Sequence, residues 1–587
     1  MLVDDGVLQL AGGRWTLRRE VESVAIPPTI HALLGARLDQ LLAPERTIAT
    51  RASVVGRVFE EEAVTQLAPD ELRRDVAANL TVLVRKELIQ PDRSTPTAGR
   101  AFKFRHILVR DAAYESLPKV MRAELHERFA DWLERVSGGR ISEYEEILGY
   151  HLEQAHAYRL ALGIVDDHTA LVGSRAGQYL VNAGRNAADR RDIPAARSLL
   201  SRAISLLPAE HADFWPAYVV LGSVLEQSAR PGDAERAVSV LDEAITATRS
   251  SNPVLSAEAQ LHRLLLEDEH SRSLDEWRRA LRPILLTLHR GQNWRASSEA
   301  WNFIANVYQT EVDVARSTAA HERAARYAER GRDTKMQLDS LLSKIELAAR
   351  SRVPVRQVIE MVQEALRSHP ATLDQRGWAL SQLGYLAALE GRIDEARELI
   401  AEGLRIAREL GTDTMNEMLR AGVVEYFGGN AAAAERHYRA AYDEARALEP
   451  GFALLVAARL AQVTFLLGRD EETERLLQEA DHIAGTGANW GAVQVAGTRA
   501  RLLARQGRVK DAVRFARDGL AAAERSGFQA YPVLYGGCLE DLAAVLADAG
   551  MTDEAREVWN AAQHVYQEKG ALILVSRAER ALASLPA

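Results

Sequence analysis

The chain of 587 residues has a single cysteine, Cys538, and few aromatic side chains, which make up 6% of the sequence. One cysteine excludes an intramolecular disulfide and is typical of a reducing compartment. Cys538 lies in a stretch with a helical pattern, so we interpret it as a buried structural thiol and not as a nucleophile. Alanine and leucine are abundant, and they favour closely packed helices over sheets because alanine loses no side-chain entropy in a helix.

Lysine is also rare, with seven residues among the 73 basic ones. This preference for arginine, together with abundant alanine, is typical of a GC-rich bacterial genome. No run of about 18 uncharged apolar residues is present, so no membrane-spanning helix is predicted. The first residues lack the basic and apolar regions of a signal peptide, and we therefore expect a cytoplasmic protein.

Catalytic and metal-binding motifs are missing as well. The sequence has no HExxH, no CxxC and no Gly-x-Ser-x-Gly motif, which are the patterns of zinc proteases, metal or redox sites and hydrolases. His151 and His156 flank Glu153, but a spacing of five does not place two ligands on one helix face. We predict no catalytic residue, no metal site and no cofactor for this chain alone.

What the chain does contain is an internal repeat of the tetratricopeptide kind. Its pattern is a small residue on a first helix, then a small, a bulky and a small residue on a second helix, where close approach needs small side chains. The clearest unit has Gly184, followed by Ala196, Leu200 and Ala203. The same pattern begins again at Gly222, Gly384, Gly422, Ala461, Ala500 and Ala543.

The turns of the array repeat too. Gly391, Gly468, Gly507 and Gly550 each stand where a first helix must end, and an acidic residue follows within the next four positions. Glycine suits a left-handed cap, and the dipole of the second helix favours an acidic residue in its first turn. Regular glycines and the lack of sustained heptads favour a solenoid over a coiled coil or a generic bundle.

Between residues 250 and 370 the repeat phase cannot be followed strictly. Two second helices are still predicted there, and we expect about ten helix pairs within residues 166–587. Tryptophans such as Trp378 are interpreted mainly as core between helices. The two predicted second helices rest on Val358, Val362 and Ala365, and on Ala320, Ala324 and Tyr327.

Residues 26–165 carry no repeat and predict a small helical domain. Its helices are expected from Ile26 to Leu42 and in five further ranges, and alternating residues near 88–91 and 101–106 predict a β-hairpin. Helices followed by such a wing indicate a winged-helix-like domain. The fold class is therefore all-α, with a tetratricopeptide-like solenoid behind a winged-helix-like module. The remaining helices are predicted over 45–55, 60–67, 70–86, 108–117 and 120–136.

Three segments carry a family resemblance. Val-Ala-Ile-Pro-Pro-Thr-Ile-His-Ala-Leu-Leu-Gly-Ala-Arg-Leu-Asp (24–39), Phe-Arg-His-Ile-Leu-Val-Arg-Asp-Ala-Ala-Tyr (104–114) and Leu-His-Glu-Arg (125–128) resemble the region that follows the ATPase domain in STAND-type signal-transduction ATPases. The nearest resemblance is to actinobacterial proteins that join an adenylate cyclase domain, an AAA-type ATPase domain and a tetratricopeptide tail. This resemblance implies a sensor half that binds a protein, peptide or small effector on the concave face of the solenoid.

The chain departs from that family in one respect. It has no Gly-x-x-x-x-Gly-Lys-Ser/Thr motif, which cradles phosphates in P-loop ATPases, and no cyclase domain. ATP is thus expected only through an ATPase domain supplied separately, and an ATPase or cyclase is an expected partner. Residues 1–25 resemble the end of an ATPase lid helix with its linker.

Arg105 and His106 are the candidate site residues. The resemblance implies that His106, with Arg105 beside it, reports the state of a nucleotide bound to an ATPase domain. The alternative is a structural, hydrogen-bonded histidine where a strand meets a helix, and without an ATPase domain in the chain we favour this alternative.

A basic wing opens a second functional alternative, a transcriptional regulator that reads DNA. The whole chain is acidic, with a net charge of −9, and acidic residues on the predicted recognition helix 70–86 would repel phosphate, which argues against DNA. A third alternative is the C-terminal part of an adenylate cyclase or ATPase. The wing region contains Arg85, Lys86, Arg93, Arg100, Lys103, Arg105 and Arg110 against Glu87 and Asp92.

Overall fold

The chain divides into two compact units, and each is described by itself. The first comprises residues 1–183 and 202–211, and the second comprises residues 184–201 and 212–587. The predicted boundaries at residues 25 and 165 stay predictions. Within the described residues, no helix is long and apolar enough to cross a bilayer. The computed structural model describes residues 8–11, 14–17, 37–92, 99–228, 230, 232–267, 271–412, 414–448, 450–484 and 490–586.

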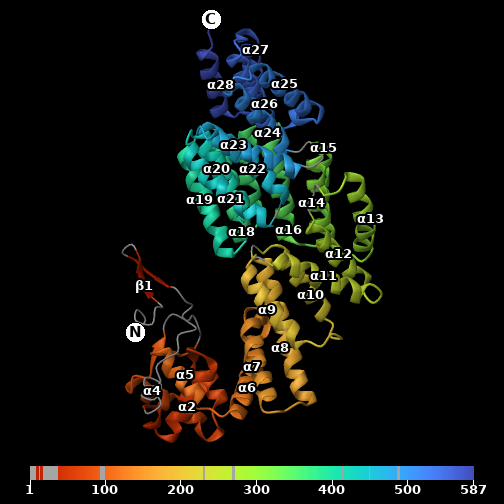
Figure 1. The fold of residues 1–587 in the computed structure, drawn as a ribbon. Helices are drawn as coiled ribbons and strands as arrows, with labels where there is room; N and C mark the ends of the chain where they lie inside the picture. Colours follow the sequence, from red (N-terminus) through yellow and green to blue (C-terminus); the bar gives the residue numbers. More distant parts are fainter. Residues whose placement is uncertain are drawn as a thin grey trace. The chain divides into compact units, whose positions relative to one another are not determined.

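The first unit combines helices with two small antiparallel sheets (Figure 1). Strands β1 and β2 form one sheet, and β3, β5 and β4 form the other, in that order. The elements are β1 (Leu8–Ala11), β2 (Arg14–Leu17), α2 (Ala43–Val55), β3 (Val58–Glu60), α3 (Glu61–Leu67), a 3₁₀ helix (Asp70–Asp75), α4 (Val76–Arg85), β4 (Ile89–Asp92), β5 (Ala101–Phe104), α5 (Ile107–Glu115), α6 (Lys119–Ser137), a 3₁₀ helix (Gly138–Glu143), α7 (Glu145–Ala161) and the start of α8 (Asp167–Asp189).

The predicted hairpin is present as β4 and β5, which pair antiparallel. Sequence reasoning missed β3, whose three residues are too few to show a period of two. Phe59 of β3 packs against Phe102 and Phe104 of β5, with ring centroids 6.0 and 5.4 Å apart. These three phenylalanines are at most 2% exposed, so the third strand closes the core over the hairpin.

The helix predicted over residues 70–86 is confirmed only in part. The helix predicted from Asp70 to Lys86 begins as a 3₁₀ helix without any buried residue, and the α-helix starts only at Val76, which is buried. Helices draw most of their stability from a packed face, and that face starts at Val76. Within residues 1–25, where we expect the end of an ATPase lid helix and its linker, the described residues 8–11 and 14–17 form the β1–β2 hairpin, and the other residues lie outside the described ones.

The helix predicted from Ile26 to Leu42 lies mostly outside the described residues.

The second unit is a stack of antiparallel helix pairs (Figure 1). From α10 to α28 consecutive helices pack on each other. Together with α8–α9, whose residues are divided between the two units, the described helix pairs up to α26–α27 number ten, followed by α28. The predicted all-α repeat array is confirmed. Its helices are α9 (Ile193–Leu206), α10 (Phe214–Glu226), α11 (Asp233–Thr248), α12 (Pro253–Leu265), α13 (Leu274–Arg290), α14 (Trp294–Thr310), α15 (Val314–Arg330), α16 (Thr334–Arg350), α17 (Val355–Ser368), α18 (Leu373–Leu389), α19 (Ile393–Leu410), α20 (Met415–Phe427), α21 (Ala431–Leu448), α22 (Pro450–Leu466), α23 (Asp470–Ala484), α24 (Trp490–Arg505), α25 (Val509–Arg525), α26 (Pro532–Asp548), α27 (Thr552–Lys569) and α28 (Leu572–Ser584).

The predicted small positions lie where two helices of a pair touch. A Cβ atom added at Gly184 would come within 2.7 Å of Leu200, and one added at Gly384 within 2.6 Å of Ile400. Such distances are far below van der Waals contact, so only glycine permits this approach. The bulky partner on the second helix is the residue that the repeat pattern predicts, sixteen positions later in both pairs.

The turns explain why the repeat phase is hard to follow between residues 250 and 370. Gly391 ends a first helix in the left-handed conformation, with φ of +86°. In the middle of the array Gln292, Val312 and Arg332 take the same conformation, with φ between +54° and +57°. Each is followed by an asparagine or aspartate that caps the next helix, which satisfies free amide groups there. The left-handed conformation is retained, but the glycine stands one position earlier, at Gly291 and Gly331, or is missing from the turn, as at Val312.

Distant repeats also touch within the second unit. Lys569 at the end of α27 is 0% exposed, and its ammonium donates hydrogen bonds to the carbonyl oxygens of Ala348, Ser351 and Val353 at 3.1, 2.7 and 2.5 Å. These carbonyls surround the end of α16, whose last turn lacks intrahelical donors. Burial lowers the pKa of Lys569 to about 7. A residue near the C-terminal end of the array thus caps a helix more than 200 positions earlier.

Candidate functional site

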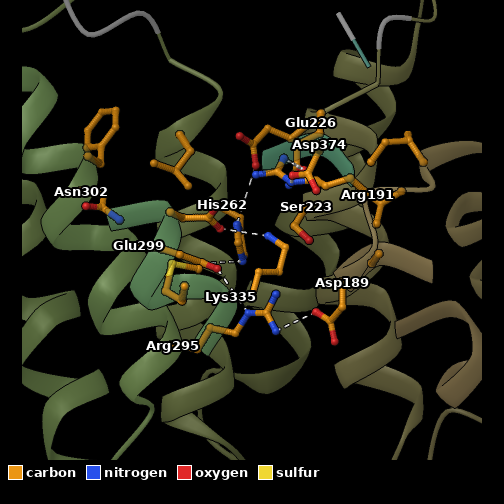
Figure 2. Close-up of a pocket in the computed structure, with 18 of the residues that line it drawn as sticks. Asp189, Arg191, Ser223, Glu226, His262, Arg295, Glu299, Asn302, Lys335 and Asp374 are labelled. Carbon is orange, nitrogen blue, oxygen red and sulfur yellow. Dashed lines mark hydrogen bonds and ion pairs between the residues drawn. The ribbon is translucent and has the colours of Figure 1, made fainter. Parts of the chain in front are cut away.

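The first helices of successive repeats line a cavity of about 850 Å³ in the second unit. Figure 2 shows its charged side chains converging from several helices. The repeat turns the second helices towards the neighbouring pairs, which leaves one face of each first helix free to line a groove. The lining includes Arg185, Asp189, Arg191, Ser223, Glu226, Glu258, His262, Glu267, Arg295, Glu299, Asn302, Lys335, Asp339, Asp374, Gln375 and Trp378.

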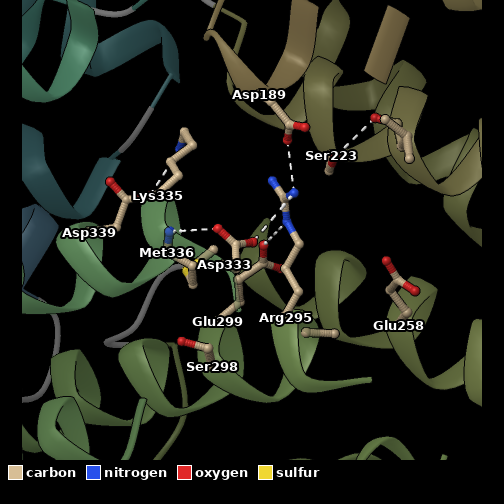
Figure 3. A network of polar contacts seen from close by, with 12 residues as sticks. Asp189, Ser223, Glu258, Arg295, Ser298, Glu299, Asp333, Lys335, Met336 and Asp339 are labelled. Carbon is tan, nitrogen blue, oxygen red and sulfur yellow. Dashed lines mark hydrogen bonds and ion pairs between the residues drawn. The ribbon is translucent and has the colours of Figure 1, made fainter. Parts of the chain in front are cut away.

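Arg295 of α14 is the centre of the polar network in Figure 3. Its guanidinium lies 2.8 Å from the carboxylate of Asp189, 3.5 Å from Glu299 and 3.7 Å from Asp333. Asp333 also accepts a hydrogen bond from the backbone N–H of Met336 and so caps α16. Burial opposes the charge of Arg295, but the three carboxylates raise its pKa, so the side chain is a permanent cation that ties three helices together.

His262 of α12 lies between two carboxylates. Its Nδ1 is 3.8 Å from Glu226 of α10, and its Nε2 is 3.8 Å from Glu299. Burial alone would lower the pKa of His262, whose exposed fraction is 7%, but Glu226, Glu299 and Glu258 raise it to about 9. The imidazole is therefore a cation at neutral pH.

The other end of the cavity is formed by α16 and α18. Lys335 lies 2.9 Å from the carboxylate of Asp339, and Gln375 donates a hydrogen bond of 2.7 Å to the same carboxylate. Arg191 pairs with Asp374 at 3.4 Å. Trp378 lies beside these groups in the lining, so one tryptophan of the array faces the cavity and not only the core.

The two predicted site residues lie in the first unit. Arg105 and His106 stand where β5 leads into α5, and both are exposed. Arg105 pairs with Glu87 at 2.8 Å. The imidazole of His106 makes no hydrogen bond with the described residues, while its backbone begins α5 in an extended conformation. His106 is thus at a strand-to-helix junction as expected, but it is not the hydrogen-bonded histidine that we favoured.

The basic residues of the predicted wing are mostly neutralised by carboxylates of the same unit. Lys103 lies 3.1 Å from Asp92, and Arg100 lies 3.2 Å from Glu61. Lys86 pairs with Glu45 of α2. Arg93 lies outside the described residues. A phosphate backbone would have to compete with these pairs.

Two buried histidines in the first unit were not predicted as a pair. His126 and His151 approach each other with Nδ1 atoms 2.9 Å apart, and Nε2 of His126 is 2.7 Å from the hydroxyl of Tyr114. Burial, together with nearby arginines, lowers the pKa of His126 to about 3, and that of His151 lies well below its ordinary value. Both rings are neutral, so the pair is a hydrogen-bonded part of the core.

The structure supports the interpretation of Cys538 as a structural thiol. Its Sγ lies 3.4 Å from the carbonyl oxygen of Leu534 in the preceding helical turn. Burial, with the charge of Asp541 acting in the same direction, raises the pKa of Cys538 to about 12. The reactive thiolate form is therefore suppressed at neutral pH.

No protein-family model matches the sequence, and no curated protein matches it either. Among solved structures, the chain is similar to the APC/C hetero-tetramer Cut9–Hcn1, with 13% identity, 78% of this chain and 92% of that chain covered, and a TM-score of 0.43. It is also similar to a STAND protein with a tetratricopeptide repeat sensor from Pyrococcus horikoshii, with 14% identity, 95% and 68% covered, and a TM-score of 0.25.

A third similar structure contains the nearly identical TPR-like repeats of a kinesin light chain from Podosopora anserina. It has 16% identity to this chain, covers 34% of it over 97% of its own length, and has a TM-score of 0.26. At these TM-scores none of the three likenesses carries an argument. The tetratricopeptide type of packing rests on the contacts of Gly184 and Gly384 described above, and the STAND resemblance rests on sequence motifs.

Proposed function

We propose that the chain is a cytoplasmic regulatory protein whose repeat array binds a protein segment, peptide or small effector in the cavity lined by α10, α12, α14 and α16. The observation that carries this proposal is the cavity itself. Its volume of about 850 Å³ is in the range of specific ligand sites. Ionic groups such as the buried His262 and the half-exposed Arg295 lie along it, and they give a ligand specific contacts rather than a featureless apolar groove.

We propose that the first unit transmits ligand binding by the repeat array to a partner protein. Its order of helix, strand, helix, helix and hairpin, with β5 between β3 and β4, supports a winged-helix-like domain. Together with the resemblance of residues 24–39 and 104–114 to STAND proteins, this arrangement supports an ATPase or cyclase partner. In that complex the exposed Arg105 and His106 would contact the nucleotide. The paired wing residues make DNA a weaker candidate ligand.

The cavity can be tested by panning a random dodecapeptide library against the purified chain. Ser223 lines the cavity on α10, so Ser223→Trp is expected to fill it and abolish enrichment of the selected peptides. Thr246→Trp on the exposed side of α11 is the matched control and should leave enrichment unchanged. Helical circular dichroism must be equal for both variants. Equal enrichment on Ser223→Trp and the parent chain would contradict the proposal.

The chain alone is expected neither to bind nor to hydrolyse ATP, because the sequence contains no phosphate-binding loop motif. Equilibrium dialysis with radiolabelled ATP and Mg²⁺ measures this directly. Saturable ATP binding by the isolated chain would contradict the assignment of nucleotide chemistry to a separate partner.

A further inference from the structure

The cavity of the second unit contains a glutamate cluster that is short of cations. We define this cluster as Glu226 of α10, Glu258 of α12 and Glu299 of α14. Glu226 and Glu299 lie near His262 (Figure 2), and all three carboxylates act on its charge. The whole lining carries seven carboxylates against four arginine and lysine side chains. Carboxylates from three successive repeats therefore converge on one buried imidazole.

His262 balances this cluster poorly. Both of its charge contacts are 3.8 Å long, and Nδ1 has no hydrogen-bond partner among the described residues although its exposed fraction is only 7%. A buried cation with a ring nitrogen that lacks a well-formed hydrogen bond loses hydration that the protein replaces only in part. The imidazole thus offsets only part of the negative charge of the cluster.

Glu258 is the least satisfied member of the cluster. Its carboxylate accepts a hydrogen bond of 2.8 Å from the neutral amide of Asn293, and no arginine or lysine of the described chain lies within ion-pair distance of it. Burial raises the pKa of Glu258, with His262 and Arg295 acting in the opposite direction. A donor that carries positive charge would relieve this burial cost.

The cations of the cavity are already engaged. Arg295 is held by carboxylates including Asp189 at 2.8 Å, and Lys335 is held by Asp339 at 2.9 Å. An anionic ligand would find no free cation and would meet the surplus of carboxylates. Within the described residues, no group of three histidine, cysteine or acidic side chains is arranged to hold a metal ion. These observations disfavour anion capture as the main contact and favour an organic cation.

We propose that the cavity binds a basic protein segment, with an arginine or lysine side chain of that segment seated among Glu226, Glu258 and Glu299 in place of the charge on His262. The inference rests on the proposed function of the cavity. Phe303, Met336 and Trp378 of the lining offer apolar surface to the aliphatic stem of such a side chain. Because two cations cannot share the cluster without repulsion, binding releases the proton of His262.

Charge preference can be measured with three fluorescein-labelled dodecapeptides. They share one Gly/Ser/Leu framework and carry arginine, glutamine or glutamate at the same three positions. By fluorescence anisotropy, the arginine peptide is expected to bind at least about tenfold more tightly than the glutamine peptide, since one desolvated charge pair contributes on that scale. The glutamate peptide should bind most weakly.

Variants separate the cavity from the general negative charge of the chain. Glu258→Gln is expected to remove the preference for arginine, whereas Glu243→Gln, on the exposed side of α11, changes the net charge equally and should keep the preference. An arginine preference that survives Glu258→Gln, or that Glu243→Gln also removes, would overturn the inference. Binding of all three peptides with equal affinity would overturn it too, while the cavity would remain a peptide site.

Proton release gives an independent readout. Calorimetry of the arginine peptide in phosphate and in Tris at pH 7.5 should differ by the ionisation heat of up to about one proton per peptide. His262→Gln should abolish that difference. If none of the peptides binds, the inference fails, but the proposed function fails only if library panning also returns no cavity-dependent peptide.

Discussion

Two stretches of the second unit carry buried ionisable side chains, but they satisfy them differently. Around His262 of α12 the carboxylates of successive first helices gather in a cavity, where Nδ1 of His262 has no hydrogen-bond partner among the described residues and Glu258 accepts from a neutral amide. Around the C-terminal end of α16 the buried groups meet those of distant repeats. Lys569 caps α16, and Arg577 of α28 donates to the hydroxyl of Tyr426 in α20 at 3.2 Å. One repeat plan therefore yields an open polar cavity in one stretch and a closed core in the other.

The closed stretch shows how a repeat array departs from nearest-neighbour stability. In a simple solenoid each repeat contacts only the adjacent ones. Here Lys569 and Arg577 link repeats separated by more than 150 positions. A binding site needs polar groups with spare capacity, and a core needs them saturated. His262 and Lys569 thus differ in how many hydrogen-bond partners the buried cation has.

The largest expected effect is that of Lys569→Ala. It removes three hydrogen bonds and a fully buried side chain, and it leaves the carbonyls of Ala348, Ser351 and Val353 without their donor. We expect the free energy of unfolding to fall by about 3–5 kcal/mol. Urea unfolding followed by far-ultraviolet circular dichroism measures it. Lys510→Ala, at an exposed position of α25, is the control. An equally small effect of both substitutions would show that the contact of Lys569 with the end of α16 does not stabilise the fold.

The contributions of Lys569 and His262 to the free energy of unfolding should change with pH in opposite directions. Because the pKa of Lys569 is about 7 when folded and about 10.4 in an unfolded chain, the unfolded chain holds more protons between these values. Stability due to Lys569 therefore rises with pH over that window, by up to about 1.4 kcal/mol per unit. For His262, raised to about 9, stabilisation is present below about pH 6.5 and is lost as the pH rises through 9.

Each pH dependence is obtained by subtracting the free energy of unfolding of a variant from that of the parent chain. The difference in stability between the parent chain and Lys569→Met should increase from pH 7 to pH 9, and the difference between the parent chain and His262→Gln should decrease over the same range. Thermal or urea unfolding at several pH values gives both curves. Slopes of equal sign would contradict the assigned protonation states.

A smaller effect should be common to both stretches. Alanine at Gly222 or at Gly422 would collide with Leu241 or Tyr438 of the partner helix, and overpacking of this kind lowers the free energy of unfolding by about 1–3 kcal/mol. Gly537 in α26 has open space at its Cβ position. Gly537→Ala should instead stabilise the chain slightly, through helix propensity. Differential scanning calorimetry distinguishes the signs, and destabilisation by all three would show that packing is not the cause.

The smallest effect is expected for Arg352→Gln. Arg352 joins the α16–α17 turn to Glu568 at 3.3 Å, but both side chains are about half exposed. Exposed ion pairs contribute about 0–1 kcal/mol to stability, so the free energy of unfolding measured in urea should fall by less than about 1 kcal/mol. A loss of stability as large as that of Lys569→Ala would show that the surface ion pair, and not the buried ammonium, holds α27 against the end of α16.

The repeat array was predictable because packing within a pair is local. Gly184 and Leu200 are sixteen residues apart, so the pattern that places them in contact is readable along the sequence. The phase became unclear where Gln292, Val312 and Arg332 adopt a conformation that usually requires glycine. Asparagine or aspartate caps at the following positions were the signal that could have located those turns.

Neither the glutamate cluster of the cavity nor the contact of Lys569 with the end of α16 could be predicted from a local sequence pattern. Glu226, Glu258 and Glu299 come from three repeats with unequal spacing, and an exposed glutamate and a converging one look alike in a sequence. Lys569 caps carbonyls that precede it by more than 200 positions. Such contacts depend on the rise and rotation of every intervening repeat, which no local pattern fixes.

The burial of Lys569 has a consequence for how this array can grow. In an open solenoid, duplication or deletion of a helix pair changes the length and leaves the other repeats intact. Here an extra pair between α17 and α26 would displace the ammonium from Ser351 and its neighbouring carbonyls. We therefore expect the number of helix pairs between α17 and α26 to be constrained, and insertions or deletions of a pair to be tolerated only outside that stretch.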